Sequence, residues 1–230
     1  MSQIQEILEI LKSHSSEESR KGMARYGINT ETAFGTGIPL LRGLAKRFGK
    51  NHELALSLWK SGFHEARILA SMIDNPKEVT EQQMDDWASK FNSWDICDQC
   101  IMNLFEDVPI AWGKVNEWCN NEEEFVKRAG FVLIARFGVS DKKAGDESFI
   151  QYFSLIYKHS DDNRPMVKKA VNWAVRQIGK RNLKLNKEAI TLADKIYLKD
   201  STAAKWIATD ALKELKSDAV QKRLKMQKKF

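Results

Sequence analysis

Apolar residues recur every three to four positions along almost the whole chain, and this helical period constrains the fold more than any other feature. The pattern runs from "QIQEILEILK" near the N-terminus to "TAAKWIATDALKEL" near the C-terminus. The apolar and polar alternation of strands is absent, and only four prolines interrupt the 230 residues. A period of 3.6 residues gathers apolar side chains on one face of a helix. The sequence therefore predicts an all-α protein.

Two of the helical segments repeat each other at a distance of 41 residues. "FVKRAGFVLIARFG" at 125–138 aligns with "MVKKAVNWAVRQIG" at 166–179, and a fainter third copy, "AAKWIATDALKEL", occupies 203–215. A period near 40 residues with two helices per unit is typical of HEAT-like repeats. We therefore predict a single HEAT-like helical solenoid domain over residues 1–230 with a concave binding face; an irregular helical domain is the alternative. Gly138 and Gly179 are expected to end helices.

Basic residues are concentrated in particular segments although the net charge is only +6. Residues 164–187 contain eight Lys or Arg and no acid, and residues 20–50 contain seven against one Glu. Residues 74–124 are the reverse, with thirteen acids and three bases. A polyanion would therefore meet selected faces of the molecule. The alternative for any one basic run is an ordinary solvated helix face.

Composition also limits the compartment and the chemistry. No apolar run reaches the ~20 residues that span a bilayer, and we expect a cytoplasmic protein. The three cysteines, Cys97, Cys100 and Cys119, are too few for a secreted disulfide framework. "CDQC" lacks the strand context of a redox motif and the second ligand pair of a zinc site. We expect reduced thiols without a catalytic role.

The helix expected over 165–180 has two contrasting faces. Stepping 100° per residue places an apolar stripe opposite a stripe that holds Lys169, Trp173, Arg176 and Lys180. Cations around a tryptophan suit a surface that binds a phosphate backbone and offers an aromatic face to a sugar or base. Arg128 occupies the position of Lys169 in the preceding repeat. The alternative is that Trp173 packs under a neighbouring repeat.

The stretch "SWDICDQC" at 93–100 starts another expected helix. Trp94, Asp98, Ile101 and Phe105 are expected on one face, with Trp94 and Asp98 one turn apart. Asp98 on this apolar face is either paired with a buried group or kept available for chemistry. Asp95 has a structural explanation, because an acid in the first turn interacts favourably with the helix dipole.

Four short motifs, in order and spacing, make the chain similar to the AlkD-like DNA alkylation repair proteins, a family of HEAT-like repeat glycosylases. These are "MARYGI" at 23–28, "SWDICD" at 93–98, "FVKRAG" at 125–130 and "VNWAVRQ" at 171–177. The resemblance assigns Tyr26, Trp94, Trp173 and the catalytic carboxylate Asp98 to the active site, and Arg128 to DNA contact near the lesion. Family members often have a second tryptophan where this chain has Ser93, and "LKSDAVQKRLKMQKKF" at the C-terminus has no clear counterpart.

The resemblance implies a monofunctional DNA glycosylase of base excision repair. Its substrate would be duplex DNA that carries cationic alkylated purines, of the 3-alkyladenine or 7-alkylguanine type. No metal, organic cofactor, membrane or obligate protein partner is implied. Two alternatives are a non-catalytic binder of damaged or unusually structured DNA and a protein-binding scaffold.

Overall fold

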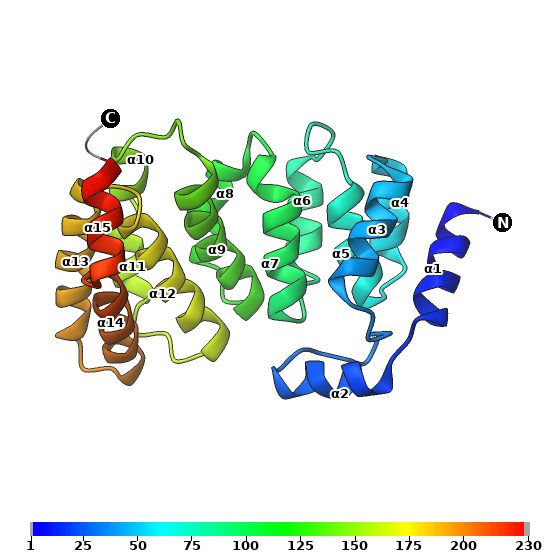
Figure 1. Cartoon of the computed structure of the whole chain (residues 1–230), viewed down its shortest axis with the longest axis horizontal. Helices are drawn as coiled ribbons and strands as arrows, with labels where there is room; N and C mark the ends of the chain where they lie inside the picture. The colour runs from blue at the N-terminus through cyan, green and yellow to red at the C-terminus, as the bar shows by residue number, and fades with distance from the viewer. Residues whose placement is uncertain (1, 228–230) are drawn as a thin grey trace. The chain divides into compact units, whose positions relative to one another are not determined.

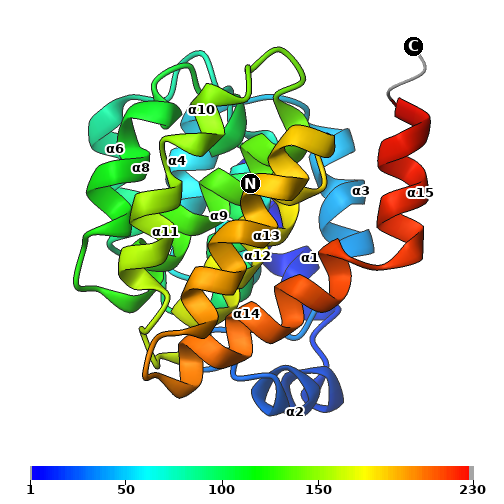
Figure 2. The same ribbon diagram turned by 90° about the vertical axis from the view of Figure 1, so that its left-hand side faces the viewer.

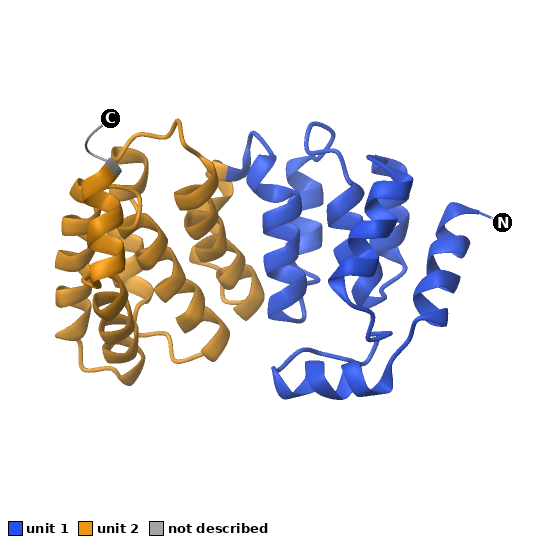
Figure 3. Cartoon of the chain, viewed as in Figure 1, with its two compact units in different colours: residues 1–111 blue, residues 112–230 orange. Residues whose placement is uncertain are grey.

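The computed structural model describes residues 2–227, and every regular element in this range is a helix. The all-α prediction is therefore confirmed. The chain divides into two compact units, residues 1–111 and 112–230 (Figure 3). We describe each unit by itself, and the single domain over 1–230 stays a prediction. Within the described range no helix is long and apolar enough to cross a bilayer.

Unit 1 contains seven α-helices and a short 3-10 helix in its described residues (Figure 1). They are α1 (Gln3–Ser13), α2 (Glu17–Arg25), α3 (Ile38–Phe48), α4 (His52–Lys60), α5 (His64–Ile73), α6 (Glu81–Ala88), α7 (Trp94–Asn103) and η1 (Phe105–Asp107). Helix α5 packs against α3, α4 and α7, and so holds the centre of the unit. Its core includes a stacked pair of indoles, Trp59 and Trp87, whose ring centroids are 4.1 Å apart.

Unit 2 holds the segments that repeat in sequence. Its helices are α8 (Ala111–Cys119), whose first residue still belongs to unit 1, α9 (Glu124–Ser140), α10 (Glu147–Ile150), α11 (Phe153–His159), α12 (Pro165–Gly179), α13 (Leu183–Tyr197), α14 (Thr202–Leu215) and α15 (Asp218–Gln227). The three similar segments lie in α9, α12 and α14, and α12 packs against both others. Helices α13 and α14 lie side by side in both views (Figures 1 and 2). The predicted HEAT-like helical repeats are confirmed.

Local sequence explains where several helices begin. Ser16, Asn51 and Ser201 each accept a hydrogen bond from a backbone N–H of the first turn of their helix. Thr80 caps α6 in the same way, accepting from the Gln83 backbone N–H at 3.1 Å. The side-chain amide of Gln83 itself donates to the buried carboxylate of Asp74 at 2.6 Å.

The two glycines expected at helix ends serve the packing between repeats. Gly138 lies inside α9, which continues to Ser140, so the prediction that Gly138 ends the helix is wrong. A Cβ on Gly138 would lie 3.3 Å from the backbone carbon of Gln177 on α12. Gly179 does end α12, and a Cβ there would lie 2.7 Å from a methyl carbon of Leu215. Both glycines allow neighbouring helices to approach closely.

Candidate functional site

The predicted catalytic pair occupies the first turns of α7. Trp94 is the first residue of this helix and is half-buried, and Asp98 follows one turn later with 7% of its surface exposed. The expected apolar neighbour Ile101 is fully buried. Helix α7 ends at Asn103, so Phe105 belongs to η1 and does not continue the face of α7 as expected. A buried carboxylate thus follows an indole by one helical turn in unit 1.

Tyr26 comes to the same place through its backbone. It caps the end of α2, its side chain is 74% exposed, and its carbonyl oxygen accepts a 3.0 Å hydrogen bond from Nε1 of Trp94. This bond joins residues that are 68 positions apart in the sequence. Gly27 follows with a φ of 73°, which turns the chain away from α2 toward the long connection to α3 (Figure 1).

The far end of that connection is held by a residue that the sequence did not single out. The Glu65 side chain, at the start of α5, accepts hydrogen bonds from the backbone N–H groups of Phe34, Gly35 and Thr36 at 2.9, 2.6 and 3.1 Å. Glu65 is only 1% exposed, so these three bonds compensate for burial of its charge. Gly35 has a φ of 82°, and a Cβ there would lie 2.4 Å from the Ser16 carbonyl oxygen.

Asp95 connects the starts of α5 and α7. Its carboxylate lies 2.8 Å from Nε2 of His64 and accepts a 2.6 Å hydrogen bond from the Ser93 hydroxyl. Burial alone would raise the pKa of the Asp95 carboxyl, but the hydrogen bonds from His64 and Ser93 outweigh it and hold that pKa below its usual range. The helix dipole therefore gives only part of the explanation for Asp95, which is also a structural partner of a buried histidine.

The predicted DNA contact Arg128 is buried in unit 2, with 6% of its surface exposed. Its Nη1 donates to the Met166 carbonyl at the start of α12, 2.7 Å away. Lys169, the equivalent residue of the next repeat, is exposed. The two cations therefore differ in accessibility although their sequence positions match. A phosphate contact by Arg128 stays a prediction, and the contact would have to reach a largely covered guanidinium.

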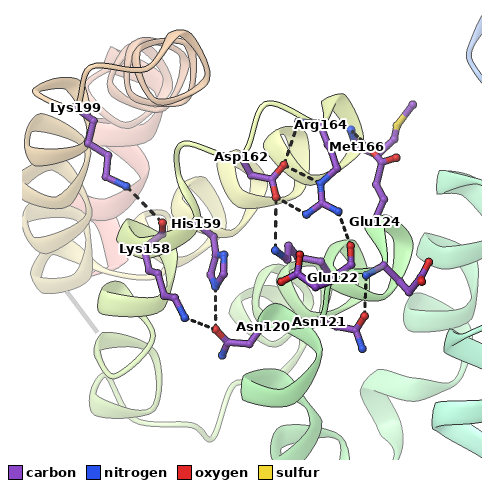
Figure 4. A network of polar contacts seen from close by, with 12 residues as sticks. Asn120, Asn121, Glu122, Glu124, Lys158, His159, Asp162, Arg164, Met166 and Lys199 are labelled. Atoms are coloured by element: carbon purple, nitrogen blue, oxygen red, sulfur yellow. Dashed lines mark hydrogen bonds and ion pairs between the residues drawn. The ribbon is translucent and has the colours of Figure 1, made fainter.

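A polar network fixes the chain around Met166 (Figure 4). Arg164 donates to Asp162 through Nε at 3.0 Å and through Nη2 at 2.5 Å, and its Nη1 reaches the Glu122 carbonyl at 2.6 Å (Figure 4). The Met166 backbone N–H donates to Glu124 at 3.3 Å. His159, near the end of α11, contacts the Asn120 side chain. The network joins the turn before α9 to the turn before α12.

The polar stripe of α12 is partly occupied by contacts to α14. The opposite, apolar stripe is fully buried as predicted, and Trp173 is half-buried. Glu214 lies 2.6 Å from both Nη1 of Arg176 and Nζ of Lys180. Burial raises the pKa of Glu214, but hydrogen bonds from the two cations outweigh it and lower that pKa. A phosphate would have to compete with Glu214 for Arg176 and Lys180.

One further aromatic residue of this helix layer is exposed. Trp206 of α14 is 41% exposed, and Nζ of Lys168 lies 5.0 Å from its ring centroid. Of the predicted site residues, Tyr26, Trp94 and Asp98 belong to unit 1, where Trp94 is hydrogen-bonded to the Tyr26 carbonyl and precedes Asp98 by one turn. The other predicted site residues belong to unit 2.

All three cysteines are buried, and none forms a disulfide. Burial raises the pKa of the Cys100 and Cys119 thiols well above the ordinary value. Such thiols stay protonated at neutral pH and are poor nucleophiles. The absence of a side chain at Gly130 of α9 leaves room for the Cys119 thiol, because a Cβ on Gly130 would lie 2.7 Å from the Cys119 Sγ.

These features are those of a HEAT-like helical repeat protein. A solved structure has the same fold over 91% of this chain and 94% of its own, with a TM-score of 0.77 and 18% identity. It is described as one of a new family of proteins related to the HEAT-like repeat DNA glycosylases with affinity for branched DNA structures. The family model for DNA alkylation repair enzymes matches residues 7–215, and the chain belongs to that family. No curated protein sequence gives a significant match.

Proposed function

We propose that the protein is a monofunctional DNA glycosylase that removes cationic alkylated purines from duplex DNA. The observation that carries the proposal is the cluster in unit 1. There Trp94 is hydrogen-bonded to the Tyr26 carbonyl and lies one helical turn before the buried Asp98. Membership of the DNA alkylation repair enzyme family supports the same reaction class. Trp173 is proposed as a further aromatic residue of the reaction.

The residue types fit the chemistry of this bond. Alkylation at a ring nitrogen makes the purine cationic, so the electron pair of the breaking N-glycosidic bond neutralises the departing base. The sugar becomes an oxocarbenium-like cation, and a water oxygen then bonds to C1′ and releases a proton. The Asp98 carboxylate stabilises the positive sugar or orients that water. The electron-rich faces of Trp94 and Tyr26 attract a cationic base or sugar.

Local anchoring supports the same assignment. Asp95, His64 and Glu65 hold the start of α7 and the connection from α2 to α3 through buried polar bonds. None of these three side chains needs to touch the substrate for this role. They pre-organise the backbone that carries Tyr26 and Trp94.

The decisive experiment replaces Asp98 by asparagine, which keeps the shape and removes the charge. If the carboxylate stabilises the transition state, single-turnover release of alkylbase from duplex DNA should slow by ~100-fold, equivalent to about 2.7 kcal/mol of barrier. Binding of the same DNA should change little. Trp173→Ala should also slow release.

Asp86→Asn is the matched control, because Asp86 is an exposed acid on α6 of the same unit. Asp95→Asn is unsuitable, since it removes the partner of a buried histidine. Melting curves must accompany the rates. Equal rates for wild type and Asp98→Asn would rule out the catalytic role, and parallel losses of stability, binding and rate would show a purely structural one.

A second function is favoured by the solved structure with this fold, which is described by its affinity for branched DNA. In this alternative the protein binds branched or damaged DNA without excision. Tight binding of a four-way junction, together with no alkylbase release by the wild type, would support it. Salt-independent binding of both DNAs would instead favour a protein scaffold.

A further inference from the structure

A basic cavity lies wholly within unit 2, where α9 and α12 end. Its volume is about 410 Å³, within the range of small-ligand sites. Four of its lining residues are cations, and among the described residues that line it none is acidic. The polar residues of this lining are Lys142, Gln177, Lys180, Arg181, Asn182 and Arg223.

Two of the cations already close helix ends. Arg181 donates through Nη1 to the Phe137 and Gly138 carbonyls at 3.3 and 3.0 Å, and through Nη2 to the Ala144 carbonyl at 3.0 Å. Arg223 donates through Nη2 to the Lys180 carbonyl at 2.8 Å. Carbonyl groups satisfy N–H donors but leave the full positive charge in place. Both guanidinium groups also keep N–H donors that these bonds do not use.

Carboxylates balance the charge only in part. Nζ of Lys180 lies 2.6 Å from Glu214, which also pairs with Arg176. Burial lowers the pKa of Arg181, and Asp141 and Asp146 oppose this effect only in part, although neither lines the cavity. Closure of helix ends accounts for Arg181 and Arg223. It does not account for the exposed Lys142 or for a cavity lined with cations.

The wall formed by Arg223 lies outside the region that the family model covers. That model ends at residue 215, whereas α15 begins at Asp218. The basic segment "DAVQKRLKMQ" of α15 therefore completes a cavity whose other walls come from the repeats. This gives the C-terminal helix a definite place in the molecule.

We propose that this cavity binds a phosphate group of the DNA backbone, away from the alkylated base. The oxygens of a phosphate group accept several hydrogen bonds from different directions. Lys142, Gln177 and the guanidinium groups of the two arginines can donate such bonds from separate elements. The proposal rests on the proposed function in so far as DNA supplies the phosphate. A free phosphate compound shares the same chemistry, and the experiment distinguishes the two sources.

The test compares two double variants that lose equal charge. Lys142→Gln with Arg223→Gln removes two cavity cations, and Lys187→Gln with Lys222→Gln removes two exposed cations that do not line the cavity. Binding of duplex DNA is measured against salt, and inorganic pyrophosphate is titrated by calorimetry without DNA. Melting curves establish that each variant is folded, and the single variant Lys142→Gln serves if loss of the Arg223 bond unfolds α15.

The cavity variant should flatten the dependence of log K on log salt by about one unit, as expected for one lost phosphate contact. It should also lose pyrophosphate binding, whereas the control variant should keep both properties close to wild type. Equal slopes and equal pyrophosphate binding for the two variants would overturn the proposal. Loss of pyrophosphate binding alone, with equal DNA slopes, would refute the DNA backbone as the source. If wild type binds no DNA, the proposed function fails, and pyrophosphate still decides whether the cavity binds phosphate.

Discussion

Replacement of Glu65 by glutamine should loosen the connection between α2 and α3 and destabilise unit 1. The carboxylate accepts three backbone hydrogen bonds at 2.6 to 3.1 Å and is almost fully buried. Glutamine keeps one oxygen but turns an NH₂ group toward N–H donors, so at least one bond becomes a donor-to-donor contact. Hydrogen bonds to charged groups contribute about 1.5–3 kcal/mol each, and the total loss should be about 3 kcal/mol.

Two measurements follow from that magnitude. For a chain of this size, ~3 kcal/mol corresponds to a fall in melting temperature of roughly 6–12 °C. If the connection opens before the unit unfolds, hydrogen exchange at the Phe34, Gly35 and Thr36 amides should become faster even below the melting transition. Hydrogen exchange of these amides therefore distinguishes local opening of the connection from global unfolding of the protein.

Glu53→Gln is the matched control, since Glu53 is an exposed acid in the first turn of α4. Its charge interacts favourably with the helix end and contributes a few tenths of a kcal/mol. A Glu65→Gln protein that melts and exchanges like Glu53→Gln would contradict the anchoring role of Glu65. Faster exchange confined to other segments would contradict it as well.

Three further outcomes are expected. Cys97→Ala with Cys100→Ala should lower the melting temperature through two small cavities, yet leave alkylbase release by the folded fraction nearly unchanged, as single-turnover assays can show. Arg128→Ala should lower the unfolding free energy through loss of the Met166 bond, and a salt titration should show a slope flatter by about one unit if Arg128 also contacts phosphate. Burial lowers the pKa of His159 from 6.5 to about 4, so the unfolded chain binds a proton there between these pH values that the folded chain does not. Stability should therefore fall on the order of 1 kcal/mol, after discount for solvent screening, as pH drops from 6.5 to 4, and urea titrations of His159→Gln should show that loss abolished.

The sequence predicted those features that depend on local periodicity. The buried stripe of α12, the repeat of α9 in α12 and the start of α7 at Trp94 all follow from the spacing of apolar residues and from nearby polar residues. A period of 3.6 residues fixes which side chains share a face, whatever the helix later packs against. These predictions needed no knowledge of distant contacts.

Features set by distant contacts were missed or only partly explained. Glu65 looks like an ordinary first-turn acid, and its three N–H partners lie 29 to 31 residues earlier in the chain. Asp95 has the same appearance, although its partner His64 lies 31 residues away. Gly138 looked like a helix end because its contact with Gln177 belongs to another repeat. The glycine-rich stretch "FGTG" at 34–37 has backbone N–H groups that need hydrogen-bond acceptors. It was the one available sign in the sequence that a buried acceptor lies nearby.

The number of cations in the sequence overstates the number that are available to contact DNA. Of the eight basic residues in 164–187, Arg164, Arg176, Lys180 and Lys184 pair with carboxylates, and Arg181 closes a helix end. Each of these residues must break an existing bond before the same donors can contact a phosphate. Lys169 is exposed and has no such bond to break. The salt dependence of DNA binding should therefore report fewer phosphate contacts than the charge of this segment suggests, and a slope near eight would show that the pairs open on the DNA.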